Sequence, residues 1–282
     1  MDEINIAYVL IAKAFRLYYS KFVLFSMLGF VLMIMSLLQF LTVGTNSTPI
    51  FFVSLIANII VSYVVYLAML RVALSPARAT LKDVLFGIEK YIVPAAWVSG
   101  IIILATFGGV ALFVIPGIIV SIFLNFSIVS VIGEHLQKTD AVIYSWRLVE
   151  GRWWRVFSRI LIAGIVLGAA TVIVISIITA GIAGNTHASS LAQTFIYEAI
   201  DGFFTLPLAL SFICVLYEDL KRVSVPKKAL QEKSIMKILA ILSIVGVMAL
   251  FAGLLFSSNS VARIVPEVVT VTHAPASVFS AF

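Results

Sequence analysis

The chain has 282 residues, of which 62% are hydrophobic and 11% are charged, and its formal net charge is +6 at pH 7. Soluble domains have roughly half apolar and a quarter charged residues, and a water-soluble fold of this length could not hide so much apolar surface. The composition therefore excludes a soluble fold and predicts an all-α, polytopic helical membrane protein.

Apolar segments long enough to cross a bilayer follow one another along the chain. A helix needs about 20 apolar residues to cross about 30 Å of hydrocarbon. Residues 22–43, 49–70, 92–114, 118–131, 156–182, 194–217 and 236–256 are the predicted spans. The run from 92 to 132 has no charge and would reach about 60 Å as one helix, so we divide it at Pro116 and Gly117. Pro207 is expected to bend the sixth span.

The positive charges alternate with these spans. Of the nineteen Lys and Arg residues, all but Arg263 lie within 13–21, 71–90, 138–159 and 221–237, whereas the connections 44–47, 108–117 and 183–193 contain none. Cytoplasmic segments carry the excess of Lys and Arg in membrane proteins. The alternation predicts a multi-pass protein of the cytoplasmic (inner) membrane, with the N-terminus in the cytoplasm and the C-terminus outside.

Two basic segments share one motif. Residues 15–22 (FRLYYSKF) and 146–153 (WRLVEGRW) both contain an aromatic residue, Arg, Leu, a small residue, a base and an aromatic residue, and 84–91 is a degenerate copy. We interpret residues 1–222 as a six-span domain of three units, at about 1–75, 76–138 and 139–222. Each unit is an interfacial elbow helix followed by a helical hairpin. Residues 223–256 add a connector and a seventh span, and 257–282 form an outside tail.

Bases beside aromatic rings are typical of segments that lie at a membrane surface. We therefore expect membrane-surface elbows, and recognition of anionic lipid head groups is the alternative role of the same side chains. The candidate interface residues are Arg16, Lys21, Trp146, Arg147, Arg152, Trp153, Trp154 and Arg155.

The segments 14–18, 115–118, 145–156 and 216–220 resemble the membrane domain of glycerophosphoryl diester phosphodiesterases and related uncharacterised prokaryotic integral membrane proteins. The likeness covers about residues 8–222. It implies a six-span helical module, which in the family is sometimes fused to a soluble phosphodiesterase barrel. The residues after 222 are too few for that barrel, so no catalytic residue is carried over, and the seventh span departs from the family pattern.

Two acids, Glu198 and Asp201, lie within a predicted span and share one helical face. If that helix starts near Leu191, they lie only a few Å below the outer head-group region. They are interpreted either as structural or interfacial residues or as a cation or proton site. The irregular helices at Pro116 and Pro207 fit transporter sites as well as ordinary packing.

Other sequence features point to packing. Gly164 and Gly168 form a GxxxG pair, interpreted first as internal helix packing and second as a dimer contact. Cys214 is the single cysteine, and no metal site, cofactor or catalytic residue is predicted. Since topology explains the basic excess, the expected partners are membrane lipids, anionic ones above all, and not nucleic acid. A homo-oligomer or a membrane protein partner stays open.

The sequence thus predicts a non-enzymatic multi-pass membrane protein with a scaffold, lipid-interacting or envelope-homeostasis role. The alternative is a small transporter or channel that uses Glu198 and Asp201. A polar cavity reaching Asp201 would favour the alternative. A membrane enzyme acting on lipid head groups has only the family resemblance in its support.

Overall fold

The computed structural model describes residues 3–43, 48–76, 79–183, 196–222 and 232–251. Within these ranges the chain forms helices joined by short turns, and no strand occurs. Seven helices in them are long and apolar enough to cross a membrane: Phe22–Thr42, Thr48–Leu74, Glu89–Leu112, Val114–Gly133, Trp153–Ile178, Ile196–Arg222 and Glu232–Phe251. The prediction of an all-α polytopic helical membrane protein is confirmed.

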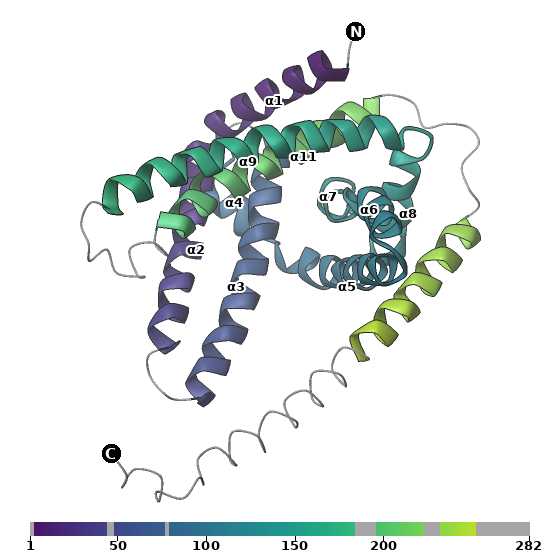
Figure 1. The fold of residues 1–282 in the computed structure, drawn as a ribbon, viewed down its shortest axis with the longest axis horizontal. Coiled ribbons are helices and arrows are strands. Elements are labelled where there is room, and N and C mark those ends of the chain that lie inside the picture. The colour runs from purple at the N-terminus through teal and green to yellow at the C-terminus, as the bar shows by residue number, and fades with distance from the viewer. Residues whose placement is uncertain (1–2, 44–47, 77–78, 184–195, 223–231, 252–282) are drawn as a thin grey trace, which may run out of the picture. The chain divides into compact units, whose positions relative to one another are not determined.

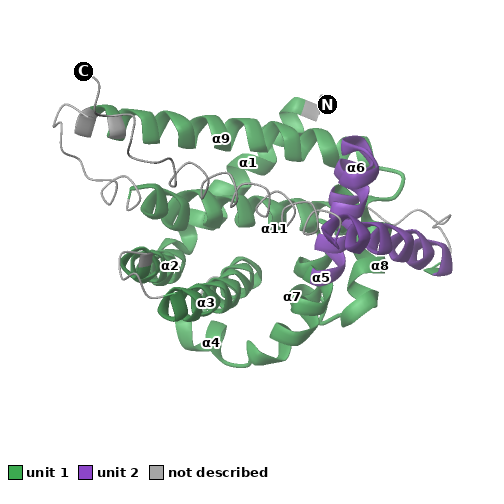
Figure 2. Cartoon of the chain, turned by 60° about the horizontal axis from the view of Figure 1, so that its bottom comes forward, with its two compact units in different colours: residues 1–99, 122–232 green, residues 100–121, 233–282 purple. Residues whose placement is uncertain are grey.

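The chain divides into two compact units (Figure 2). The larger unit comprises residues 1–99 and 122–232, and the smaller comprises 100–121 and 233–282. The described helices, in chain order, are α1 (Glu3–Ser20), α2 (Phe22–Val43), α3 (Thr48–Leu74), α4 (Leu81–Leu85), α5 (Glu89–Leu112), α6 (Val114–Leu124), α7 (Ser127–Gly133), α8 (Lys138–Val149), α9 (Trp153–Ala183), the π-helix η1 (Asp201–Thr205) and α11 (Leu206–Arg222). The predicted three-unit division of residues 1–222 stays a prediction.

In the larger unit, α1 lies along α11 and α9, and the α2–α3 hairpin projects from this layer (Figure 1). The buried residues of the α2–α3 hairpin are concentrated toward one end of α3. On α3, Leu67 and Leu70 are fully buried, whereas Ile59 and Ile60 are about 60% exposed. Outward-facing apolar side chains along most of a helix match a hydrocarbon surrounding. Tertiary packing is therefore concentrated at the ends that carry the bases.

The two predicted elbows have matching backbone hydrogen bonds. The N–H of Lys21 donates to the carbonyl of Tyr18 at 3.1 Å, and the N–H of Arg152 donates to the carbonyl of Val149 at 2.9 Å. These donors occupy the same position of the shared sequence motif. The elbows differ at the small residue: Gly151 has a φ of 74°, which glycine adopts at no steric cost, whereas α1 stays helical up to Ser20.

The turn between the third and fourth spans lies earlier than expected. Helix α5 ends at Leu112 and α6 begins at Val114, so the break is at Phe113, and Pro116 and Gly117 lie inside the first turn of α6. Proline is tolerated there because its missing N–H would have no intrahelical partner. Gly117 still has a role in the turn, since a Cβ on Gly109 would lie 2.7 Å from its Cα.

Glycines also set how closely helices approach in each unit. In the smaller unit, a Cβ on Gly108 of α5 would lie 1.7 Å from the carbonyl oxygen of Leu242, and one on Gly246 would lie 2.2 Å from that of Leu104. The backbones of α5 and the helix Glu232–Phe251 are therefore in direct contact. The seventh span is packed onto the third by these two glycines.

The predicted GxxxG pair behaves differently. A Cβ added to Gly164 or Gly168 would meet no atom within 4 Å, because both residues face outward from α9. The expected internal packing at this pair is wrong. The close glycine contact of the larger unit lies instead between α2 and η1, where a Cβ on Gly29 would be 2.4 Å from the carbonyl oxygen of Gly202.

Candidate functional site

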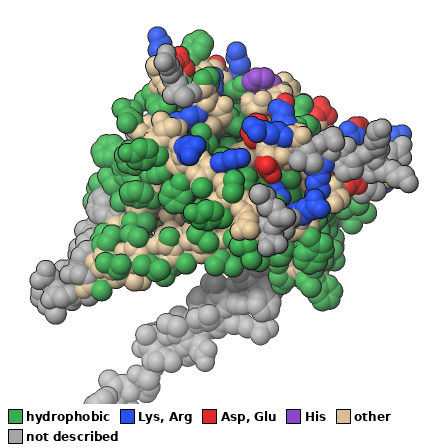
Figure 3. Space-filling view, turned by 90° about the horizontal axis from the view of Figure 1, so that it is seen from above, with side chains coloured by type: hydrophobic (Ala, Val, Ile, Leu, Met, Phe, Trp, Pro, Cys, Tyr) green, Lys and Arg blue, Asp and Glu red, His purple; other side chains and the backbone are tan. Residues whose placement is uncertain are grey.

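Lys and Arg side chains gather on one face, with acids among them, and hydrophobic side chains cover the flank (Figure 3). Hydrogen bonds join the elbows to the ends of the returning helices of the larger unit. Each predicted hairpin has one contact between its elbow and the end of its returning helix. We term them the hairpin-closing contacts: Lys21 with the end of α3, Tyr91 with His135 after α7, and Arg152 with the end of α11.

Lys21 makes the first hairpin-closing contact. Its side chain is 5% exposed, and its ammonium donates to the carbonyl oxygens of Val72 at 2.7 Å, Ala73 at 3.2 Å and Ser75. The last carbonyls of a helix have no intrahelical partner and carry the negative end of the helix dipole. The elbow base therefore caps the end of α3 and ties the two helices of the hairpin together.

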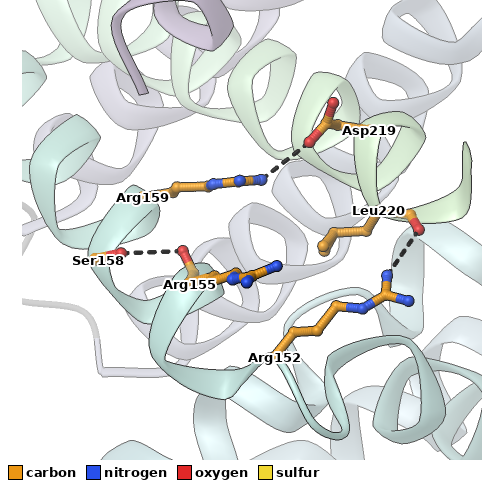
Figure 4. Close-up of polar contacts among 6 residues, drawn as sticks. All are labelled: Arg152, Arg155, Ser158, Arg159, Asp219 and Leu220. Carbon is orange, nitrogen blue, oxygen red and sulfur yellow. Dashed lines mark hydrogen bonds and ion pairs between the residues drawn. The ribbon is translucent and has the colours of Figure 1, made fainter. Parts of the chain in front are cut away.

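Arg152 makes the corresponding contact in the third predicted hairpin (Figure 4). Its Nη1 donates to the carbonyl oxygen of Leu220 near the end of α11, at 3.4 Å. Two helical turns on, Arg159 is buried and forms an ion pair with Asp219, with 2.9 Å between Nη1 and Oδ2. Arg155 projects from α9 toward the same end of α11 (Figure 4). Arg152, just before α9, and Arg159 of α9 thus hold the end of α11.

The second predicted hairpin is closed by an aromatic pair. The hydroxyl of Tyr91 and Nδ1 of His135 are hydrogen-bonded at 2.9 Å, and the two rings are stacked with centroids 5.8 Å apart. His135 is exposed and has this partner. Arg71 lies over the Tyr91 ring at 5.6 Å and donates to the carbonyls of Val84 and Phe86. The residue that matches Lys21 and Arg152 in this copy of the motif is Lys90, which is exposed, so this hairpin is closed one position later and between two side chains.

Tyr18 of α1 compensates for the proline in the sixth span. In a regular helix the carbonyl of Phe203 would accept from residue 207, but Pro207 has no N–H. The Tyr18 hydroxyl donates to this carbonyl at 2.8 Å, and burial raises the pKa of the phenol, so it stays a donor. The helix around Pro207 carries the π-helix η1 at Asp201–Thr205, which is the irregularity expected from the proline.

A carboxylate joins α7 to α11 on the same face. Tyr217 donates to Oε1 of Glu134 at 3.1 Å, and Lys221 forms an ion pair with the same oxygen. The hydrogen bond from Lys221 holds the pKa of Glu134 below its ordinary value. Glu134 is therefore ionised at neutral pH and links two helix ends.

The predicted interface residues separate into exposed and buried side chains. Arg16 and Arg155 are exposed, and Trp154 is 74% exposed. Trp146 is buried instead, and its ring stacks on Phe123 with 4.2 Å between centroids. Exposed members of the set lie where a head group can reach them, whereas Trp146 belongs to the packing of α8.

The other members of that set have protein partners. Arg147 pairs with Glu232, with 2.8 Å between Nη2 and Oε1. The Trp153 ring is partly buried and stacks on Phe157 with 5.0 Å between centroids. Lys21 and Arg152 make the closing contacts described above. Sequence position alone therefore does not separate bases that contact the protein from bases that face its surroundings.

The predicted acid pair lies at the start of the π-helix. Glu198 is partly buried, and Asp201, the first residue of η1, is exposed. The neighbouring cavity, of about 310 Å³, lies between α1, α9 and the sixth span and is lined by apolar side chains such as Phe15, Ile200 and Phe204, not by either carboxylate. The structure thus brings the acids to an irregular helix beside an apolar cavity.

Another cavity, also of about 310 Å³, lies on the basic face among α1, α3 and α11. Its lining includes Lys13, Glu218, Asp219 and Arg222. Within the described ranges, no group of three or more His, Cys, Asp and Glu side chains is arranged to hold a metal ion. The lining of this cavity thus presents charged groups of both signs.

Comparison of the chain with protein-family models, curated proteins and solved structures finds no match. The resemblance to the membrane domain of glycerophosphoryl diester phosphodiesterases therefore stays a prediction.

Sequence reasoning missed two structural contacts of this region. Arg159 gives a recognisable signal, because a base inside an apolar helix requires an acidic partner. The hydrogen bond of Tyr18 to Phe203 has no such signal, since the two residues are far apart in sequence and nothing local marks the unpaired carbonyl. The charged cavity was missed because its lining comes from three separate helices.

Proposed function

We propose that this chain is a non-enzymatic, lipid-interacting scaffold of the cytoplasmic membrane, and that its basic face binds anionic head groups of the inner leaflet. One observation carries the proposal. Bases such as Lys21 and Arg159 are buried in contacts with the protein, whereas Arg16, Lys90 and Lys138, which lie in or near the basic segments of the sequence, are exposed and form no ion pair among the described residues. Within the part of the chain that the structure describes, these exposed bases are therefore available to a partner outside the protein.

Physical chemistry favours lipid as their partner. A base near an anionic leaflet gains about 1 kcal/mol, and the gain decreases over a Debye length of about 8 Å at physiological salt. Exposed aromatic side chains near the same helix ends, Tyr19, Phe86 and Trp154, are suited to the head-group region. Bases and rings together match the composition of an interfacial surface.

The proposal is tested with the triple variant Arg16→Gln/Lys90→Gln/Lys138→Gln. Purified protein is placed in nanodiscs of increasing anionic lipid content, and bound anionic lipid is counted by native mass spectrometry after extraction. Removal of three bases at about 1 kcal/mol each predicts roughly 100-fold weaker retention at low salt. The matched control Arg16→Lys/Lys90→Arg/Lys138→Arg keeps the charges and the wild-type retention. Equal retention by the glutamine variant and the wild type would contradict the proposal.

A second function, a small transporter or channel, is favoured by one observation. The π-helix η1 begins at Asp201, and such irregular turns are frequent at functional sites. The apolar cavity beside η1 counts against an ion path, so lipid interaction is the preferred function. Asp201→Asn in proteoliposomes distinguishes the two: loss of a cation or proton flux would replace the scaffold proposal, and the absence of any flux in wild-type liposomes would exclude transport of those ions.

A further inference from the structure

The cavity among α1, α3 and α11 has an apolar base and a charged rim. Leu10 and Cys214, each 2% exposed, line it together with Ala73. Three exposed charged residues complete the rim, namely Lys13, Glu218 and Arg222, and Asp219 lies beside them. This change from apolar to charged matches a lipid at the membrane interface, whose glycerol backbone and first methylenes lie below its head group.

Both signs of charge are represented equally in the lining. Lys13 and Arg222 are the bases, and Glu218 and Asp219 are the acids. Lys13, Glu218 and Arg222 form no ion pair among the described residues, and Asp219 uses one carboxylate oxygen for Arg159. A ligand that carries one negative and one positive group can therefore pair with both kinds of side chain.

The charge balance discriminates among phospholipids. A head group that is only anionic would meet Lys13 and Arg222 but would leave Glu218 and Asp219 facing negative charge. A quaternary ammonium cannot donate hydrogen bonds and is bound best by aromatic rings, and the lining of this cavity contains no aromatic side chain. A primary ammonium can donate hydrogen bonds to the carboxylates while the phosphate accepts from the two bases.

We propose that this cavity binds the head group of a phospholipid carrying a phosphate diester and a primary ammonium, as in phosphatidylethanolamine. Lys13 and Arg222 hold the phosphate, and Glu218 and Asp219 accept from the ammonium. The inference rests on the proposed lipid-interacting function and names a site for one lipid class within it. It differs from the general attraction of the basic face for anionic lipid, because selectivity here comes from the acids.

The test measures lipid selectivity on the full chain. Protein in detergent is incubated with equal amounts of phosphatidylethanolamine, phosphatidylglycerol and phosphatidylcholine with identical acyl chains, and bound lipid is counted by native mass spectrometry. Wild type is expected to retain phosphatidylethanolamine preferentially. Glu218→Gln and Lys13→Gln are each expected to weaken that retention about tenfold. Glu218→Lys is expected to shift the preference to phosphatidylglycerol, because it removes the repulsion of a purely anionic head group.

Matched controls and a soluble competitor complete the experiment. Lys82→Gln and Glu89→Gln change exposed charges outside the lining of this cavity and are expected to keep the wild-type selectivity. Equal retention of the three lipids by wild type, or unchanged selectivity in Glu218→Gln, would overturn the proposal. Full displacement by water-soluble phosphoethanolamine at the lipid's own concentration would overturn the assignment to a lipid. A different result would contradict the proposed function: equal retention of anionic lipid by the triple glutamine variant and by wild type. The two proposals can therefore be refuted independently.

Discussion

Replacement of Lys21 by methionine tests the closing contact at the first elbow. The ammonium of Lys21 binds three carbonyl oxygens at the end of α3, those of Val72, Ala73 and Ser75. Methionine keeps most of the buried stem and removes only the charged donors. Hydrogen bonds to charged groups contribute about 1.5–3 kcal/mol and the helix dipole adds up to about 2 kcal/mol. We expect Lys21→Met to cost about 3 kcal/mol in the free energy of unfolding.

The assay is thermal unfolding of the purified protein in detergent, followed by tryptophan fluorescence. A loss of 3 kcal/mol corresponds to a Tm about 6 °C lower, at about 2 °C per kcal/mol for a chain of this size. Lys82→Met is the control, because Lys82 is exposed and its side chain has no acceptor among the described residues. A Tm for Lys21→Met within about 1 °C of the wild-type value would refute the capping role.

Three further predictions use the same measurement. Tyr18→Phe leaves the Phe203 carbonyl without its donor and is expected to cost about 1–2 kcal/mol; an unchanged Tm would contradict this. The Lys221 hydrogen bond lowers the pKa of Glu134 below its ordinary value of 4.5. The ionised Glu134 carboxylate therefore contributes fully to stability above pH 4.5, and this contribution is lost as the pH falls through the lowered pKa. The Tm difference between wild type and Glu134→Gln should therefore vanish in acid, and a difference that grows there would be contrary to the expectation. Gly246→Leu should separate the seventh span from α5 and lower the Tm, whereas Gly164→Leu, which meets open space, should not; equal effects would contradict the helix contact.

The spans were predictable because the bilayer imposes one strong rule. A crossing helix must be apolar over about 20 residues and must satisfy its own backbone hydrogen bonds. The sequence alone therefore placed helices such as Phe22–Thr42 and Trp153–Ile178 within a few residues of their observed bounds. Predictions that followed from length and polarity were reliable for this chain.

Predictions based on single residues were less reliable. The sequence predicts a helix break at Pro116 and Gly117, but a proline in the first turn fits a helix that has already restarted after Phe113. Gly164 and Gly168 match a packing motif, but whether another helix lies opposite depends on the tertiary structure. Gly108 and Gly246, which do mediate a close helix contact, are in no such motif and come from different spans.

The candidate site could be predicted only in part. The repeated motif pairs Lys21 with Arg152, and the N–H of each residue donates to the carbonyl three residues before it. The acceptors of their side chains are backbone carbonyls on the returning helix, and these are invisible in a sequence because every residue has one. A base that caps a helix and a base that faces lipid therefore look alike until the partner helix is known.

Accessibility from the two sides of the membrane tests the central claim, that the helices cross a bilayer with their basic ends at its cytoplasmic face. In a Cys214→Ser background, a cysteine is placed either at Thr48, at the exposed start of α3, or at Lys82 on α4. A membrane-impermeant maleimide should label Thr48→Cys only from the outside and Lys82→Cys only from the cytoplasmic side. Labelling of both cysteines from the same side would contradict the claim.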